Sequence, residues 1–509
     1  MRPRDPASYA WSDIHALNEV SLAVYDHLLL GNRHCAELLR ARGHSPYLNV
    51  VAVFFHAFQR ALSNHFILTY ERSSGVESAP MRKRNPRRLR KLLRTAGRNV
   101  RTQLQRSMLH RWNYSSSVAS VAPSVLYSEN VGLNIGALRQ ALGESARLVP
   151  VRSTNPKLAI PELDDQLALL RPCVAQLTST LVRSHGIPEA DVARLVLTLE
   201  SIVRRHTADD AQVLGCKSLV VGSLLNLQAR LWAVLAKEAR IPVVTVVHGE
   251  AYGVVDEPVF GYGESTYVDV MVGYGAGGWK AAQQGRYLRG LFDEVPRLVC
   301  SSAPVVQRLR TSRPIPRISD LTRRRALYVP TMLTGQDWRY GPFRDTNDAA
   351  YMHWQHRLLT ALAASFDAPV GWKRHPEDRV KMEVSGVGIK AYQDALFQDV
   401  VDDFDILVFD YFSSAFSIAA ATNKPIIYLD LGLRNFTGPG IEAVKERSIY
   451  VRADPLDAVG CVRQALELGD KDCVNNFSPT FSLADDRPRE EVVAETLREI
   501  LSAQGVPSA

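Results

Sequence analysis

The sequence predicts an α/β protein with parallel sheets, because short apolar segments alternate with polar loops and helical stretches. The pattern is clearest between Pro369 and Asp430, where three apolar segments each end in a polar loop. These segments are Val370–Trp372, Ile406–Phe409 and Pro425–Leu429. A similar alternation over residues 124–272 predicts a second sheet. We therefore expect two domains of the same kind.

Length and composition agree with this expectation. A chain of 509 residues exceeds one ordinary hydrophobic core, so two or three domains are expected. Hydrophobic residues make up 46% and charged residues 22%, as in folded soluble proteins. Residues 1–13 are polar and no apolar run reaches transmembrane length, so we expect neither a signal peptide nor a membrane span. Six scattered cysteines without a CxxC pair indicate a reducing cytoplasm and disfavour a zinc ribbon.

The first predicted sheet has five strands with helices between them. The strands are Ser124–Tyr127, Arg147–Val151, Ser218–Val221, Val243–Val247 and Val270–Val272. The helices are Asp164–Ser184, Glu189–His206 and Asn226–Arg240. The loop after Tyr127 resembles the first turn of a Rossmann-like domain, although it lacks GxGxxG. The fourth strand ends in His248, Gly249 and Glu250, which we name the HG loop.

The second predicted sheet begins at Ala326–Val329, after a linker near residues 311–325 that is rich in Arg, Pro and Ser. Loops after parallel strands open on one edge of a sheet, where ligands bind. We expect His375, the Ser413–Ser414 pair and the polar residues after Leu429 to converge there, with the loops of His375 and the serines at adjacent strand ends. The candidate ligand-binding residues are Lys373, Arg374, His375, Pro376, Ser413 and Ser414. Two hydroxyls at a helix start suit a phosphate, the cations add donors, and Pro376 fixes the turn.

The same residues resemble a known group of enzymes. The patterns K-x-H-P, then D-x-x-x-x-D-Y-x-S-S and K-P-I-I-Y, are similar to the donor half of bacterial surface-polysaccharide transferases. These include CDP-glycerol glycerophosphotransferases, bacterial sialyltransferases and capsular Kdo transferases. The resemblance covers about residues 215–430, including the HG loop, and Phe412 is an addition to the family's DYSS. It implies that His375, Ser413 and Ser414 hold the phosphate of a cytidine nucleotide, with Lys373 or Arg374 in support.

The resemblance also implies the GT-B architecture: two Rossmann-like domains facing a cleft, with an N-terminal helical extension. The expected divisions are a helical extension at 1–112, an acceptor domain at 113–315 and a nucleotide-donor domain at 316–485. Residues 486–509 carry a last helix, Arg489–Ser502, that we expect to pack back on the first domain.

Inverting transfer needs a base that takes the proton of the acceptor hydroxyl. His248 is the first candidate, because a histidine accepts a proton near neutral pH, and Glu250 and Glu264 follow if partly buried. The sequence equally allows His248 to be a hydrogen-bonded loop residue and Glu264 to be a surface carboxylate. In a retaining reaction all three would only orient the acceptor.

No metal site is expected, because helix dipoles and basic side chains can neutralise a leaving phosphate in this architecture. The sequence contains an acidic cluster that precedes a predicted strand instead of ending one, so we interpret it as a solvated turn. Its members are Asp399, Asp402, Asp403 and Asp405.

Together these features predict a cytoplasmic, metal-independent glycosyltransferase at the inner face of the membrane. It would move a nonulosonic acid or Kdo from a CMP-activated donor to a capsule polysaccharide, lipopolysaccharide or other glycolipid. Alternatives are a CDP-glycerol or CDP-ribitol phosphotransferase, a non-hydrolysing sugar-nucleotide epimerase, and a catalytically silent glycan- or lipid-binding scaffold. No cofactor is expected besides the CMP- or CDP-linked donor, which is a substrate. Donor sugar, linkage, stereochemistry and oligomeric state stay open.

Residues 81–112 form a basic segment with twelve Lys or Arg and no acidic residue. Leu89, Leu92 and Leu93 begin an apolar stripe at helical spacing, which is typical of a helix on an anionic membrane surface. A solvated helix capping the first domain is the alternative. Nucleic-acid binding is not expected, because no aromatic residues are interleaved and no known module accompanies the charge.

Reversing Arg87, Arg88, Arg90 and Lys91 to glutamate should release the protein from anionic vesicles. Each cation near such a surface contributes about 1 kcal/mol to binding. Co-sedimentation with vesicles at rising salt measures this, and wild-type binding should fall through screening. If the wild-type protein does not bind anionic vesicles at low salt, the membrane interpretation is contradicted.

Overall fold

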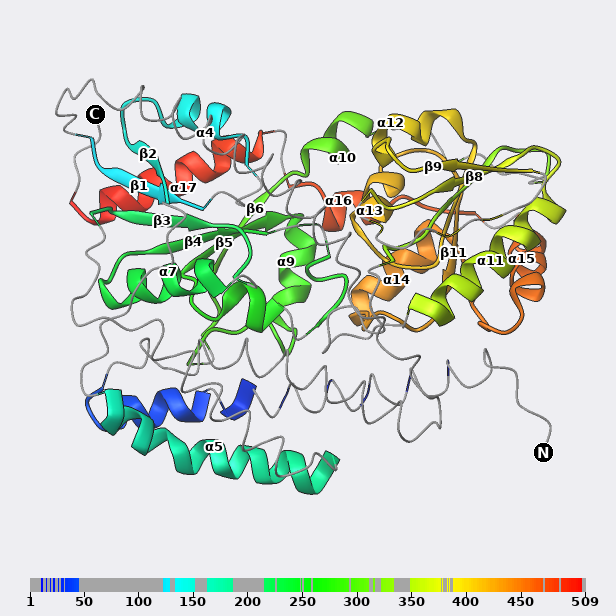
Figure 1. Cartoon of the computed structure of the whole chain (residues 1–509). Coiled ribbons are helices and arrows are strands. Elements are labelled where there is room, and N and C mark those ends of the chain that lie inside the picture. Colours follow the sequence, from blue (N-terminus) through cyan, green and yellow to red (C-terminus); the bar gives the residue numbers. More distant parts are fainter. Residues whose placement is uncertain are drawn as a thin grey trace, which may run out of the picture.

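The computed structural model describes most of the chain beyond residue 121 and parts of the first 44 residues. The ranges are 29–31, 33–44, 122–128, 133–151, 163–185, 215–224, 227–247, 249, 251–257, 260–292, 294–310, 315, 322–333, 348–376, 378, 382, 384, 388–469, 472–484 and 487–505, with residues 11, 15, 19, 22 and 26. Figure 1 shows two α/β domains side by side, with α9, α13, α14 and α16 at their boundary.

The first domain contains a six-stranded parallel sheet in the order β2-β1-β3-β4-β5-β6. Its strands are β1 (Ser124–Tyr127), β2 (Arg147–Pro150), β3 (Ser218–Val221), β4 (Val243–Val246), β5 (Val270–Tyr274) and β6 (Arg297–Ser301). The chain reverses direction across the sheet between β1 and β3, which makes their carboxyl ends the switch point of this sheet.

The second domain contains a six-stranded parallel sheet in the order β12-β11-β10-β7-β8-β9. Its strands are β7 (Ala326–Val329), β8 (Val370–Lys373), β9 (Ile389–Tyr392), β10 (Ile406–Phe409), β11 (Ile426–Asp430) and β12 (Ile449–Arg452). This is the Rossmann strand order, with its switch point between β7 and β10. The predicted pair of Rossmann-like domains, in the GT-B arrangement, is therefore confirmed.

One expectation about the second sheet is wrong. The loops carrying His375 and Ser413 do not follow neighbouring strands, because β7 lies between β8 and β10. Strands of a sheet are about 4.8 Å apart, so the two loops are separated by roughly 10 Å along the sheet edge. They flank the switch point from opposite sides.

The helices connect the strands and cover both sheets. They are α4 (Ile135–Leu142), α5 (Leu163–His185), α7 (Leu227–Glu238), the π-helical turn η1 (Gly261–Ser265), α9 (Ala276–Gln283), α10 (Pro304–Leu309), α11 (Asp348–Ser365), α12 (Phe397–Val400), the 3₁₀ turn η2 (Val401–Asp403), α13 (Ser414–Ala420), α14 (Gly438–Arg447), α15 (Ala458–Glu467), α16 (Phe477–Phe481) and α17 (Arg489–Ala503). The predicted helix over residues 189–206 lies outside the described residues.

The last helix crosses back to the first domain. Val493, Leu497 and Leu501 of α17 are buried in one cluster with Val125 and Val220 of the first sheet. Figure 1 shows α17 lying across the first sheet beside α4. The C-terminal segment therefore completes the core of the domain that the chain built first.

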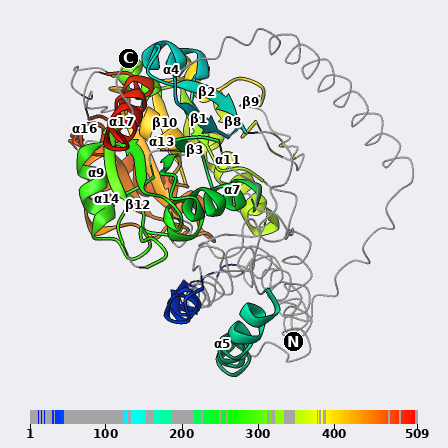
Figure 2. The ribbon, with the colours of Figure 1, turned by 90° about the vertical axis from the view of Figure 1, so that its left-hand side faces the viewer.

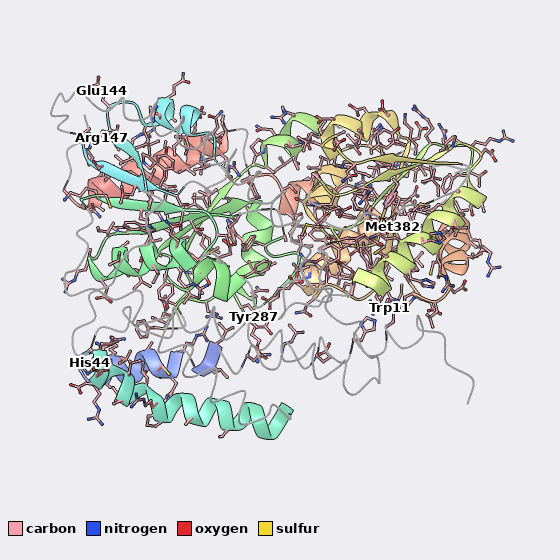
Figure 3. The ribbon with its side chains drawn as sticks, in the orientation of Figure 1. Trp11, His44, Glu144, Arg147, Tyr287 and Met382 are labelled. Atoms are coloured by element: carbon pink, nitrogen blue, oxygen red, sulfur yellow. The ribbon has the colours of Figure 1, made fainter. Side chains whose placement is uncertain are left out.

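The described residues between 11 and 41 are helical and contact both domains. Trp11 is buried in the core of the second domain, whereas Cys35 and Leu39 are buried in a cluster that extends from the first domain into the second. Figure 3 shows Trp11 below the second domain and His44 below the first. Figures 1 and 2 show α5 alongside this helical segment. The basic segment 81–112 lies outside the described residues, and none of the described helices is long and apolar enough to cross a bilayer.

A set of main-chain contacts, the interdomain clamp, joins residues 251–257 of the first domain to residues 434–440 of the second. The Asp256 amide donates to the Asn435 carbonyl at 2.9 Å, and the Thr437 amide donates to the Val254 carbonyl at 2.9 Å. A Cβ on Gly440 would lie 2.1 Å from the Val254 oxygen, so glycine permits this approach. The clamp fixes the end of the HG loop against the second domain.

Arg447 anchors α13 from its C-terminal end. It is fully buried, and its guanidinium donates to the carbonyls of Ala419, Ala420, Thr422 and Lys424 at 2.9–3.3 Å. Burial lowers its pKa to about 10, so it stays charged at neutral pH. This cation satisfies carbonyls at the end of α13, where a helix leaves acceptors without internal partners.

Replacing Arg447 by methionine should destabilise the second domain by about 3–5 kcal/mol, because buried carbonyls lose their donors. Guanidinium unfolding of wild type and variant measures the loss. Arg463→Met is the matched control, since Arg463 is exposed on α15 and should change stability little. Equal stability of the two variants would show that the anchor contributes nothing.

Candidate functional site

The residues Asp410–Ser414, which we name the serine turn, follow β10. Phe412 is fully buried against the rings of Phe416, Phe436 and Phe477. Ser413 is the N-cap of α13 in extended backbone, half-buried, and the exposed Ser414 is the first helical residue. Neither hydroxyl hydrogen-bonds to any residue of the described chain. The additional Phe412 thus anchors the turn and leaves both serines at the helix start.

Asp410, the first residue of the serine turn, is the centre of a buried network. Its carboxylate accepts from Tyr328 at 2.5 Å, from Tyr351 at 2.7 Å and from the Trp354 indole at 2.8 Å. The Thr331 amide in turn donates to Tyr351 at 3.0 Å. Burial raises the pKa of Asp410 to about 6, and the three donors oppose that rise. The network joins β7, α11 and β10 at the switch point.

The sequence prediction gave Asp410 no role, although its position offered a signal. A carboxylate directly after a fully apolar buried strand must find donors inside the protein. Here the donors come from residues 56–82 positions earlier in the chain. Their convergence is a product of the strand order.

The two cations of the HP loop, residues 373–376, are buried. Lys373 donates to the Arg374 carbonyl at 2.5 Å, and burial lowers its pKa. Arg374 pairs with Asp378 at 3.3 Å, donates to Gln393 at 3.2 Å and lies over the Trp372 ring. Neither side chain points outward, because their exposed fractions are 4% and 7%. Both have partners inside the domain.

His375 lies at the outer end of this loop and is half-buried. The Asp378 amide donates to the His375 carbonyl at 3.1 Å, which closes the turn through Pro376. The Asp378 carboxylate also accepts from the Leu333 amide at 2.7 Å, in the loop after β7. The turn therefore holds the His375 backbone beside the switch point, opposite the serine turn.

The HG loop of the first domain reaches the serine turn of the second. A Cβ built on Gly249 would lie 3.8 Å from the Ser414 Cβ, which is van der Waals contact. His248 and Glu250 themselves lie outside the described residues. The described flanks of the loop, Val247 and Ala251, connect β4 to the interdomain clamp. The carboxyl edges of the two sheets thus meet at this place.

Glu264 lies deeper on the first-domain side, in the π-helical turn η1. It is 3% exposed, and the hydroxyls of Ser223 and Tyr252 donate to its carboxyl group. Burial raises its pKa to about 8. Glu264 is therefore not a surface carboxylate; it lies at the end of β3, under the chain that follows the HG loop. π-Helical turns are frequent at functional sites.

An ion pair across the domain boundary completes the site. Arg434, in the loop after β11, donates to the Glu257 carboxylate of the first domain at 2.7 Å. The same nitrogen donates to the Tyr411 hydroxyl at 3.1 Å, and the guanidinium lies 4.8 Å from the centre of the Tyr411 ring. The sequence analysis assigned no role to Arg434 or Glu257. Their separation of 177 residues leaves no local pattern to detect.

Among the described residues, no group of three or more His, Cys, Asp or Glu side chains could hold a metal ion. In the acidic cluster, Asp405 pairs with Arg325, and Asp399 accepts from the Leu396 amide at the start of α12. Asp402 and Asp403 are exposed. These carboxylates are part of a surface turn.

No protein-family model matches the chain, and no curated protein matches it. Among solved structures it is similar to the spinosyn rhamnosyltransferase SpnG, with 12% identity, a TM-score of 0.33 and coverage of 75% of this chain and 96% of that one. The spinosyn forosaminyltransferase SpnP has 12% identity and a TM-score of 0.34, with coverage of 74% of this chain and 99% of that one. The glycosyltransferase SnogD from Streptomyces nogalater has 12% identity and a TM-score of 0.34, with coverage of 74% of this chain and 100% of that one. With TM-scores this low, the fold assignment rests on the strand orders of the two sheets.

Replacing Glu264 by glutamine should remove a pH dependence of stability. Burial raises the pKa of Glu264 from its ordinary value near 4.5 to about 8, so the folded protein binds a proton that the unfolded chain releases. Wild type should therefore lose stability relative to Glu264→Gln as pH rises from about 4.5 to about 8. Urea unfolding at three pH values in this window measures the difference. A constant difference across the window would contradict a buried, protonated Glu264.

Proposed function

We propose that this protein is a metal-independent glycosyltransferase that uses a nucleotide-activated sugar as donor. The observation that carries the proposal is the contact between Gly249 and Ser414, which brings the carboxyl edges of two Rossmann-like sheets together. Such edges are where ligands bind in open α/β sheets. Two substrates held on opposite domains can react there with their reacting groups aligned.

The donor side of the site is in the second domain. The Ser413 and Ser414 hydroxyls lie at the start of α13, and His375 lies across the switch point from them. Hydroxyls, helix-start amides and a histidine suit a phosphate that gains charge when the sugar leaves. This chemistry stabilises a leaving nucleotide without a metal ion.

The donor is proposed to be a cytidine nucleotide, with a CMP-linked nonulosonic acid or Kdo first. Support comes from the K-x-H-P and D-Y-x-S-S patterns, whose residues occupy the two sides of the switch point. The acceptor is proposed to be a surface polysaccharide or glycolipid held by the first domain. A CDP-glycerol donor would use the same phosphate-binding groups, so a donor panel distinguishes the two.

The acceptor base is proposed to be His248 or Glu250 of the HG loop, because that loop contacts the serine turn. Glu264 is placed differently: at 3% exposure, with two hydroxyls donating to it, it is enclosed below the chain after that loop. We therefore assign Glu264 to supporting the loop through Tyr252. It is removed from the candidates that meet the acceptor hydroxyl directly.

Alanine at His375, or at both Ser413 and Ser414, should abolish transfer and weaken nucleotide binding by about 1.5–3 kcal/mol, the value of a charge-assisted hydrogen bond. Calorimetric titration with CMP and CDP, beside UDP and dTDP, measures the affinity. Assays with CMP-sialic acid, CMP-Kdo and CDP-glycerol identify the donor.

Ser502→Ala is the matched control, because Ser502 is an exposed hydroxyl on α17 of the first domain. Unchanged nucleotide affinity in a folded triple variant would exclude the serine turn and His375 as the donor site. Tight binding of dTDP or UDP with no response to CMP or CDP would retain the transferase and overturn the cytidine donor.

A further inference from the structure

The strand order decides which loop is next to the serine turn. The serine turn follows β10, which pairs with β11 on one side and with β7 on the other, so the loops after these two strands are its neighbours at the carboxyl edge. The described residues of the loop after β7, 330–333, include no Lys, Arg or His. The HP loop follows β8, on the far side of β7. Its two cations are buried and have partners within the second domain, as described above. A cation next to the serine turn is therefore expected in the loop after β11.

Arg434 occupies that loop. Its guanidinium contacts Tyr411, which is within the serine turn itself and two residues before Ser413. The following residues continue the contact, because the Phe436 ring packs against Phe412. Arg434 is 13% exposed at its side chain, so it lies at the margin of the site and not deep in the core.

Its partner Glu257 belongs to the other domain and is 2% exposed. A phosphate presents the same chemistry to an arginine as a carboxylate does, with more oxygens and more charge. The net gain from a buried ion pair is small, because desolvation offsets attraction. Glu257 can therefore hold Arg434 in position and be displaced by a stronger anion.

Resting on the proposed function, we propose that Arg434 binds the phosphate of the nucleotide donor beside Ser413 and Ser414. Glu257 occupies its guanidinium until the donor arrives. Donor binding then releases Glu257, which lies in the interdomain clamp at the end of the HG loop. The alternative is a purely structural pair that joins the domains and takes no part in binding.

The two interpretations differ in how the substitutions change nucleotide affinity. The changes are opposite if Arg434 binds phosphate, and alike if the pair is only structural. If Arg434 binds phosphate, Arg434→Gln should weaken CMP or CDP binding by about 10- to 100-fold, and Glu257→Gln should strengthen it by roughly 2- to 10-fold through loss of a competitor. Cytidine, which has no phosphate, should bind both variants and wild type alike. If the pair is only structural, both variants should weaken binding together, or neither should change it.

Calorimetric titration of the full chain with cytidine, CMP and CDP carries the test. Arg452→Gln is the matched control, since Arg452 forms an ion pair with Asp430 one strand further from the serine turn. The double variant Arg434→Gln/Glu257→Gln leaves no unpaired charge, so it is titrated in place of the single Arg434 variant if that variant does not fold. It should bind CMP and CDP as weakly as predicted for Arg434→Gln.

Three results overturn the inference. Wild-type affinity for CMP and CDP in the double variant would remove Arg434 from the site while leaving the donor site in place. If Arg434→Gln weakened the binding of cytidine and of CDP equally, the substitution would have a general structural effect. Wild type that binds none of CMP, CDP, UDP and dTDP would overturn both the inference and the proposed donor site.

Discussion

The site depends on the interdomain clamp, in which the main chains of the two domains contact each other. Residues 253–256 and 435–437 exchange backbone hydrogen bonds across the boundary, and Val255 and Phe436 form an antiparallel bridge. Gly253, at φ +81°, lies so close to Gly278 that a Cβ would meet its carbonyl oxygen at 1.9 Å. Only glycine meets both requirements, the backbone angle and the close approach. Because the interdomain clamp begins where the HG loop ends, it brings the HG loop of the first domain to the serine turn of the second.

Buried ionisable groups hold the edges of the site. Asp410 begins the serine turn and accepts from three neutral donors, and Arg447 holds the opposite end of α13 by donating to main-chain carbonyls. Glu264 has a comparable place in the first domain. Burying such groups costs free energy unless hydrogen bonds compensate. Side chains fixed by internal partners need little reordering on binding, which suits the proposed nucleotide site.

The cations show how burial redistributes roles. The pair in the HP loop carries the family-like pattern, yet both side chains stabilise their own domain. Arg434, in a loop that carries no recognised motif, has its partner across the domain boundary. The Asp378 amide closes the turn at His375, and the Asp378 carboxylate accepts from the loop after β7. Charge in a motif and charge at the domain boundary are thus separate properties, since the sheet order decides which side chains can reach the edge.

The sequence by itself determined the fold class and the central strands, whereas the donor role of the loops at His375 and Ser413 stays a proposal. Central parallel strands such as β3, β4 and β10 are buried on both faces, so they stand out as unbroken apolar segments. The edge strands β6 and β12 were not predicted, because their partial exposure mixes polar residues into the pattern. Only the tertiary structure decided that β7 separates β8 from β10, that Asp410 meets Tyr328, and that Arg434 meets Glu257. These contacts join residues far apart in the chain, and strand order, which local periodicity does not encode, brings them together.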